Sequence, residues 1–155
     1  MKKLLMFFAT ALVFFAVGCG TTQVKDLDDT SIIIVPTSSI AEIDGDTTLE
    51  DYIITLKGAG ELTFEGENSG YGLFITSMNG KENEVISSTA NSSEGYSWTV
   101  YIDFLTVDGV IYAGDSETVV HDGITLYKAI YGVSAIPCLE NHTYAFVYEY
   151  YNFTW

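Results

Sequence analysis

The spacing of hydrophobic and polar positions changes along the chain, and each pattern predicts a different element. Residues 4–17 form a nearly continuous apolar run, residues 49–56 repeat apolar side chains every three to four positions, and the chain after residue 60 alternates in short stretches. The first run is short for a membrane span, the repeat indicates one helix, and the alternation indicates strands. We therefore expect an apolar leader, one helix and several strands.

The predicted helix has an apolar stripe along one face and residues typical of a helix start and a helix end. Four apolar residues fall at i, i+3, i+4 and i+7, namely Leu49, Tyr52, Ile53 and Leu56. Thr47 and Glu50 have the spacing of an N-terminal capping box. Gly58 and Gly60 are expected to end the helix.

Short stretches of β-branched and aromatic residues predict the sheet. They occupy residues 32–35, 61–64, 72–78, 96–103, 110–113, 124–133 and 143–151. The last alternates strictly, with Tyr144, Phe146, Tyr148 and Tyr150 on one face and Ala145, Val147, Glu149 and Tyr151 on the other. Together with the helix, this pattern predicts an α+β domain of β-grasp type, in which one helix packs on a mixed sheet of about five to seven strands.

Three dipeptides mark tight turns, because both of their residues tolerate positive φ. They are Asn79-Gly80, Asp108-Gly109 and Asp122-Gly123. Asn79-Gly80 favours a hairpin, and a simple loop after the strand is the alternative. Residues 83–94 (NEVISSTANSSE) are expected to form the long polar loop of the domain. Residues 151–155 are expected to fray or to cover a sheet edge.

The N-terminal pattern predicts a lipid anchor. Lys2 and Lys3 precede the apolar run, which ends in Ala-Val-Gly before Cys19 and resembles a bacterial lipobox. The alternative is an ordinary secretory signal. We expect residues 1–18 to be a signal peptide, residues 19–30 to be the acylated Cys19 and a polar tether, and residues 31–155 to be one domain. This predicts a protein anchored by lipid to the extracytoplasmic face of a bacterial cell membrane.

Charge excludes one class of partner. The chain has 21 acidic residues, no arginine and a formal net charge of −15. Only Lys25, Lys57, Lys81 and Lys128 follow the leader, so the remainder carries 4 − 21 = −17. A phosphate backbone would be repelled, and we expect no nucleic-acid partner. The high acidity itself is typical of a solvated surface.

Residues that could support catalysis are few. His121 and His142 each lie in turn-like sequence, and solvated turn histidines are the simplest interpretation. Asp44-Gly45-Asp46 lacks the further oxygens of a calcium loop. Cys138 has no partner once Cys19 is acylated, and its apolar neighbours predict a buried thiol rather than a reactive one. We expect no enzyme, no metal site and no resident cofactor.

The order of these motifs resembles a known family. Residues 62–65 (LTFE), an aromatic-glycine step, residues 72–80 (GLFITSMNG), a polar loop and an aromatic strand with Trp98 are similar to the C-terminal β-domain of transcobalamin and intrinsic factor. Bacterial lipoproteins that carry this domain alone share the pattern. The helix TTLEDYIITL also matches, the likeness is clear over residues 32–101, and residues 130–149 (IYGVSAIPCLENHTYAFVYE) continue it in outline.

The resemblance implies a β-grasp ligand-binding module with a corrinoid as its first candidate ligand. The matching positions are Tyr71, Gly72, Phe74, Thr76, Trp98, Val100 and Tyr101. Phe74 and Thr76 alternate with Ile75, so only one of these sets can face a ligand.

The family's helical domain, with its metal-coordinating histidine, has no counterpart here, and Ser97 separates two aromatics that adjoin in the carriers. The leading hypothesis is therefore a membrane-anchored module that binds a small flat ligand. A partner protein would complete the site. The alternative is a cell-surface protein–protein interaction or adhesion module with no small-molecule ligand, which would use exposed aromatics or a sheet edge.

Overall fold

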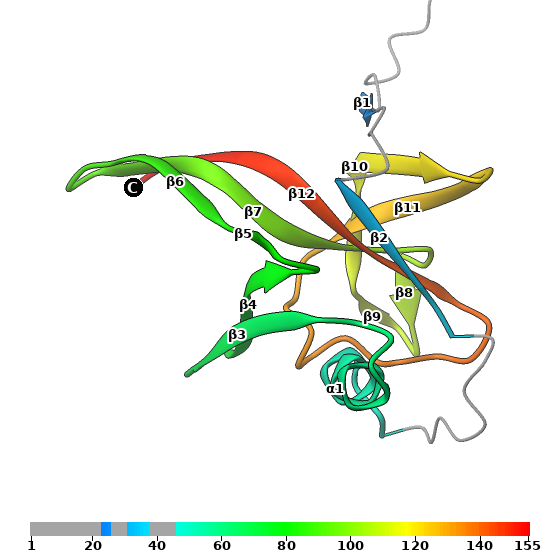
Figure 1. The fold of residues 1–155 in the computed structure, drawn as a ribbon. Coiled ribbons are helices and arrows are strands. Elements are labelled where there is room, and N and C mark those ends of the chain that lie inside the picture. Colours follow the sequence, from blue (N-terminus) through cyan, green and yellow to red (C-terminus); the bar gives the residue numbers. More distant parts are fainter. Residues whose placement is uncertain (1–22, 26–30, 38–45) are drawn as a thin grey trace, which may run out of the picture.

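The structure is a computed structural model that describes residues 23–25, 31–37 and 46–155 (Figure 1). Its elements are β1 (Gln23–Lys25), β2 (Ile32–Pro36), α1 (Leu49–Ala59), β3 (Phe64–Ser69), β4 (Gly72–Met78), β5 (Lys81–Glu82), β6 (Glu84–Ser88), β7 (Ser92–Ile102), β8 (Thr106–Val107), β9 (Val110–Ile111), β10 (Ala113–His121), β11 (Ile124–Ala129) and β12 (Thr143–Thr154). The predicted signal peptide, Cys19 and Asp44-Gly45 lie outside the described residues. Within the expected tether, β1 is a strand rather than free chain.

The fold is mostly β, and the predicted α+β plan of β-grasp type is wrong. Strands hold 59% and helix 9% of the described residues. The strands form a seven-stranded sheet in the order β1-β10-β11-β7-β12-β2 with β6 added to β7, a three-stranded sheet β3-β4-β5, and the pair β8-β9. The prediction failed because β6 and β10 are polar in sequence, so their residues were not expected to form strands. The helix therefore covers only part of a larger antiparallel structure.

β12 lies between β7 and the edge strand β2 in the larger sheet. It pairs with β2 on one side, and on the other with β7 over the whole register from Tyr144↔Ile102 to Thr154↔Ser92. In Figure 1 this long β7–β12 pair runs from the upper left across the molecule, and α1 lies at the bottom. The predicted alternation of this strand is confirmed, because alternate residues enter two separate cores. Tyr144 and Phe146 join the main core, whereas Ala145 and Val147 join a smaller one.

The helix forms as predicted, but its cap lies one residue further on. Thr48 is the N-cap, and its side chain and backbone N–H form a capping box with Asp51 rather than Thr47 with Glu50. The shift has a tertiary cause: the N–H groups of Leu49 and Glu50 donate to the carbonyls of Ile136 and Val133. At the other end, Gly60 caps the helix in the left-handed conformation, and Gly58 lies inside it.

The three predicted turns are confirmed as two-residue hairpins. Asn79-Gly80 joins β4 to β5, Asp108-Gly109 joins β8 to β9, and Asp122-Gly123 joins β10 to β11. All six residues have positive φ, between 47° and 81°. The Asp-Gly and Asn-Gly pairs therefore fixed these connections.

The predicted polar loop is wrong over most of its length. Residues 84–88 form β6, which pairs antiparallel with the start of β7. Only a short turn remains, in which the Thr89 hydroxyl lies 2.9 Å from the Ser92 hydroxyl. Residues 151–155, which were expected to fray or to cover a sheet edge, do not fray, because β12 continues to Thr154 and Trp155 donates from its backbone and ring nitrogens to this turn.

Candidate functional site

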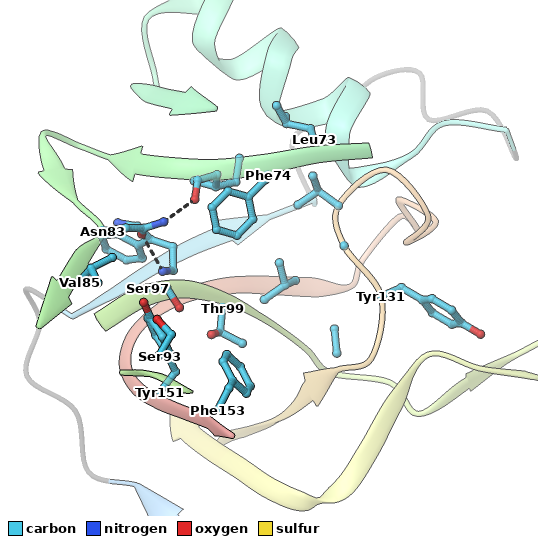
Figure 2. A pocket seen from close by; sticks show the side chains of 16 residues that line it. Leu73, Phe74, Asn83, Val85, Ser93, Ser97, Thr99, Tyr131, Tyr151 and Phe153 are labelled. Atoms are coloured by element: carbon cyan, nitrogen blue, oxygen red, sulfur yellow. Dashed lines mark hydrogen bonds between the residues drawn. The ribbon is translucent and has the colours of Figure 1, made fainter. Parts of the chain in front are cut away.

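A cleft of about 530 Å³ opens between β4 and β7, and we call it the β4–β7 cleft (Figure 2). Its apolar lining residues are Leu73, Phe74, Ile75, Val85, Trp98, Val100, Ala129, Val133 and Phe153. Its polar ones are Asn83, Ser93, Ser97, Thr99, Tyr131 and Tyr151, and Gly132 completes the wall. Among the described residues, no charged side chain lines it. The volume and the apolar lining are typical of a small-molecule site.

The cleft forms where β4 and β7 each have an unpaired stretch of edge, and these two stretches lie close together. On one side of β7, β6 pairs as far as Tyr96 and β11 begins to pair at Tyr101. Residues 97–100 are therefore paired with β12 alone. In β4, β5 pairs only with Ser77 and Met78, and the Asn83 N–H extends this edge to the Thr76 carbonyl, so residues 72–75 have no strand on this side. Two strand edges thus face the same space.

Side chains occupy part of the place of the missing strand. The Asn83 amide nitrogen donates to the Ile75 carbonyl at 2.9 Å, and its amide oxygen accepts from the Trp98 N–H at 3.2 Å (Figure 2). The Ser134 hydroxyl accepts from the Leu73 N–H at 2.8 Å. Asn83 therefore bridges the two edges and fixes the spacing of the cleft at one end.

The structure brings three of the seven predicted ligand residues into the cleft, namely Phe74, Trp98 and Val100. Phe74 is 56% exposed, and Ile75 from the same strand is buried in the main core. Tyr71 is fully exposed at the β3–β4 turn, and neither it nor Gly72 or Thr76 lines the cleft. No ring contact joins Tyr71 to Trp98 in the described part of the chain.

Trp98 is a wall of the cleft rather than a free stacking platform. Only 7% of it is exposed, its ring nitrogen donates to the Lys81 carbonyl at 2.8 Å, and its ring packs 5.3 Å from that of Tyr148. The Lys81 ammonium in turn lies 4.0 Å from the centre of the Tyr148 ring. A substitution at Trp98 would therefore disturb the fold as well as any ligand.

Tyr101 is buried behind β7, away from the cleft, in a charged network. Its hydroxyl donates to Glu149 at 2.9 Å, and Lys128 lies 2.8 Å from Glu149 and 3.0 Å from Glu117. Burial and the Glu149 carboxylate raise the pKa of Tyr101. Burial alone would also raise the pKa of Glu149, but the hydrogen bond and charge of Lys128, together with the hydrogen bonds of Thr99 and Tyr101, outweigh it and the net shift is downward. These interactions stabilise the sheet and give Tyr101 a structural role.

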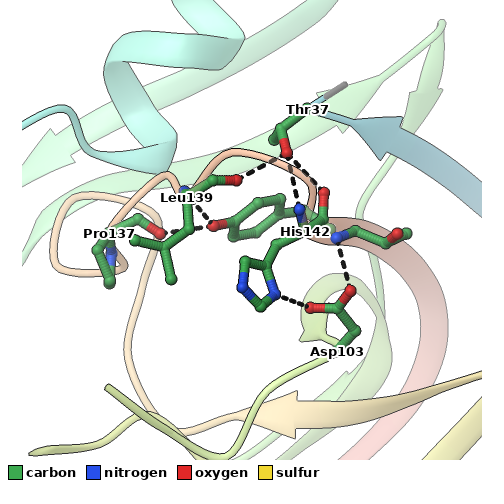
Figure 3. Close-up of polar contacts among 7 residues, drawn as sticks. Thr37, Asp103, Pro137, Leu139 and His142 are labelled. Carbon is green, nitrogen blue, oxygen red and sulfur yellow. Dashed lines mark hydrogen bonds and ion pairs between the residues drawn. The ribbon is translucent and has the colours of Figure 1, made fainter. Parts of the chain in front are cut away.

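Each of the two histidines lies beside an aspartate. His142 Nδ1 lies 2.7 Å from Asp103, whose other carboxylate oxygen accepts from the Thr143 N–H at 2.9 Å (Figure 3). The Thr37 hydroxyl is near but lies 2.7 Å from backbone carbonyls, including that of His142. The cluster ties β2 to the start of β12. His121 contacts Asp122 at the β10–β11 turn.

Cys138 is buried and free, as predicted. Burial, and secondarily the charge of Asp51, raises the pKa of its thiol to about 11. A thiol with this pKa is protonated at neutral pH and is a poor nucleophile or metal ligand. Over residues 46–155 and the shorter described segments, no group of three or more His, Cys, Asp or Glu residues is placed to hold a metal.

Thirteen of the sixteen residues that line the cleft were not among the predicted ligand residues, and three of them show why. Asn83 was placed in the polar loop, Tyr131 in a strand over residues 124–133, and Phe153 in an end expected to fray or to cover a sheet edge. Asn83 carried a weak signal, because it is a polar residue between two β-forming stretches. The positions of Tyr131 and Phe153 depend on long-range pairing that the local pattern does not contain.

The fold and the cleft define an antiparallel β protein with an uncharged, mostly apolar cleft between two strand edges. No family model matches the chain, and no curated protein or solved structure matches it either. No helix within the described ranges is long and apolar enough to cross a membrane.

Proposed function

We propose that this protein is a lipid-anchored, extracytoplasmic binding module whose β4–β7 cleft holds a small uncharged ligand. The observation that carries the proposal is the neutral apolar lining of the cleft in a chain with a net charge of −15. A buried charge without a partner is costly, so a neutral ligand suits this space. The lipobox-like sequence that ends at Cys19 supports the anchor.

A corrinoid is the first ligand to test. The sequence resemblance implies it, and the convergence of Phe74, Trp98 and Val100 on the cleft supports it. A cleft of about 530 Å³ would hold one edge of such a ligand. Most of the macrocycle would stay outside, and a partner protein is the natural cover for that part.

The test is a titration of the full chain, purified in detergent, with dicyanocobinamide and cyanocobalamin. Phe74→Ala is the diagnostic variant, because its ring is 56% exposed and lines the cleft. Half the burial energy of a phenylalanine is about 1 kcal/mol, or roughly five-fold in Kd. Ile54→Ala is the matched control, since Ile54 is 50% exposed and lies on α1 outside the cleft.

Saturable binding that weakens in Phe74→Ala and not in Ile54→Ala supports the proposal. Equal affinity in both variants would move the ligand to another surface. No binding of either corrinoid by a folded chain would remove the corrinoid as the ligand. The protein–protein interaction module would then become the better explanation.

A further inference from the structure

The two strand edges that face the β4–β7 cleft give it a chemical preference. In a strand, the N–H and C=O groups of one residue point to the same edge, and those of the next point to the other. The Trp98 N–H donates to Asn83 toward the cleft, so Trp98 and Val100 direct their main-chain groups to that side. In β4, the Leu73 N–H donates to Ser134 and the Ile75 carbonyl accepts from Asn83. Leu73 and Ile75 therefore direct their main-chain groups to the side of β4 that faces away from β3.

Asn83 shows what kind of group fits between these edges. Its primary carboxamide donates to one strand and accepts from the other, as the peptide group of an inserted strand would. Asn83 also donates its backbone N–H to the Thr76 carbonyl, and it occupies only one end of the open stretch, because residues 97–100 and 72–75 have no strand on that side. The rest of the cleft is lined mostly by apolar side chains, together with the hydroxyl-bearing residues Ser93, Ser97, Thr99, Tyr131 and Tyr151.

We propose that the ligand of this cleft carries carboxamide groups that hydrogen-bond to the free edges of β4 and β7 beyond Asn83. This inference rests on the proposed function and adds the ligand's recognition chemistry. A carboxamide supplies a donor and an acceptor without charge, which matches main-chain edges in a neutral cleft. A carboxylate would find no cation among the lining residues that the structure describes. The amide-substituted rim of a corrinoid and the backbone of an extended uncharged peptide both offer this chemistry.

A matched pair of ligands tests the inference. Dicyanocobinamide carries peripheral carboxamides, whereas dicyanocobyrinic acid heptamethyl ester keeps the same macrocycle and replaces them with esters, which cannot donate. Loss of two or more such hydrogen bonds is expected to weaken binding about ten-fold or more. A capped tripeptide, acetyl-Val-Thr-Val-methylamide, and its backbone N-methylated form provide the same comparison for a peptide.

Two glycine variants test whether the ligand binds in the β4–β7 cleft. Gly132 lines the cleft, and a Cβ there meets nothing within 4 Å, so the added side chain of Gly132→Phe starts in open space. Gly58 in α1 is equally open and lies away from the cleft, which makes Gly58→Phe the control. We expect the amide ligand to lose at least about ten-fold in affinity for Gly132→Phe and to bind Gly58→Phe as tightly as the unaltered chain.

The outcomes separate the two proposals. Tighter binding of cobinamide than of its ester, lost in Gly132→Phe, supports the carboxamide inference with a corrinoid as source. Preference for the capped peptide over its N-methylated form, with no corrinoid bound, supports it with a peptide as source. Equal affinity for amide and ester overturns the inference and leaves the proposed function in place. Binding of none of the four ligands overturns both.

Discussion

The buried carboxylate of Glu149 provides a sharp test of how the large sheet is stabilised. Glu149 is 5% exposed, accepts from Tyr101 at 2.9 Å and lies 2.8 Å from Lys128. Glu149→Gln keeps the size of the side chain and removes its charge. Breaking a buried ion pair costs about 3–5 kcal/mol. The Lys128 side chain is 35% exposed and keeps Glu117 at 3.0 Å, so we expect a smaller loss of about 2 kcal/mol in the free energy of unfolding.

The loss should depend on pH in a defined direction. The pKa of Glu149 is lowered in the folded state from an ordinary value of 4.5. Its stabilising contribution is therefore complete above pH 4.5 and disappears as the pH falls through the lower folded-state pKa. The difference in stability between the unaltered chain and Glu149→Gln should be constant near neutrality and shrink in acid.

Urea denaturation followed by tryptophan fluorescence measures both effects, at pH 7 and in steps below pH 4.5. Glu117→Gln is the control, because Glu117 pairs with the same lysine but its side chain is 58% exposed. We expect that variant to lose at most about 0.5 kcal/mol. Equal losses from the two variants, or a Glu149→Gln difference that does not change in acid, would refute the argument.

Three further variants or reagents test other parts of the structure. Gly72→Ala should lose about 1–3 kcal/mol in urea denaturation, because Gly72 has a φ of 100° and an added Cβ would collide with the Ser134 side chain. Thr48→Ala should cost about 1 kcal/mol and Glu50→Ala much less, as thermal unfolding will show, since Thr48 is the cap. Cys138 should react with a thiol reagent at pH 7 only when urea unfolds the chain, because it is buried and its pKa is raised to about 11.

The sequence predicted the elements whose chemistry is local. The Asn-Gly and Asp-Gly turns were correct because their backbone conformation is set by the two residues themselves. β4 was predicted with its observed bounds, Gly72–Met78, because its residues are strongly β-forming. The helix was found from its stripe, and only the cap was displaced, by contacts from residues 133–136 that lie far along the chain.

The rest depends on pairing between distant residues. β6 and β10 are strands because β7 and β11 provide their hydrogen-bond partners. Their sequences alone are typical of polar turns, as in the Ala-Gly-Asp-Ser-Glu that begins β10. The candidate site shows the same limit. Phe74, Trp98 and Val100 meet only after β4 and β7 come together, and Tyr101 was included although its neighbour Val100 necessarily points to the opposite face.

The pairing of β12 with both β7 and β2 has a consequence for folding kinetics. β2 must wait for this strand, and its flanking Thr37 bonds to His142 across 105 positions of sequence. Closing such long loops costs entropy before any contact repays it, so chains of this topology fold slowly. A nascent chain that has not yet made β12 cannot assemble the main core. We therefore expect such a chain to stay unfolded and protease-sensitive until β12 has been synthesised and is free to pair, and then to fold cooperatively.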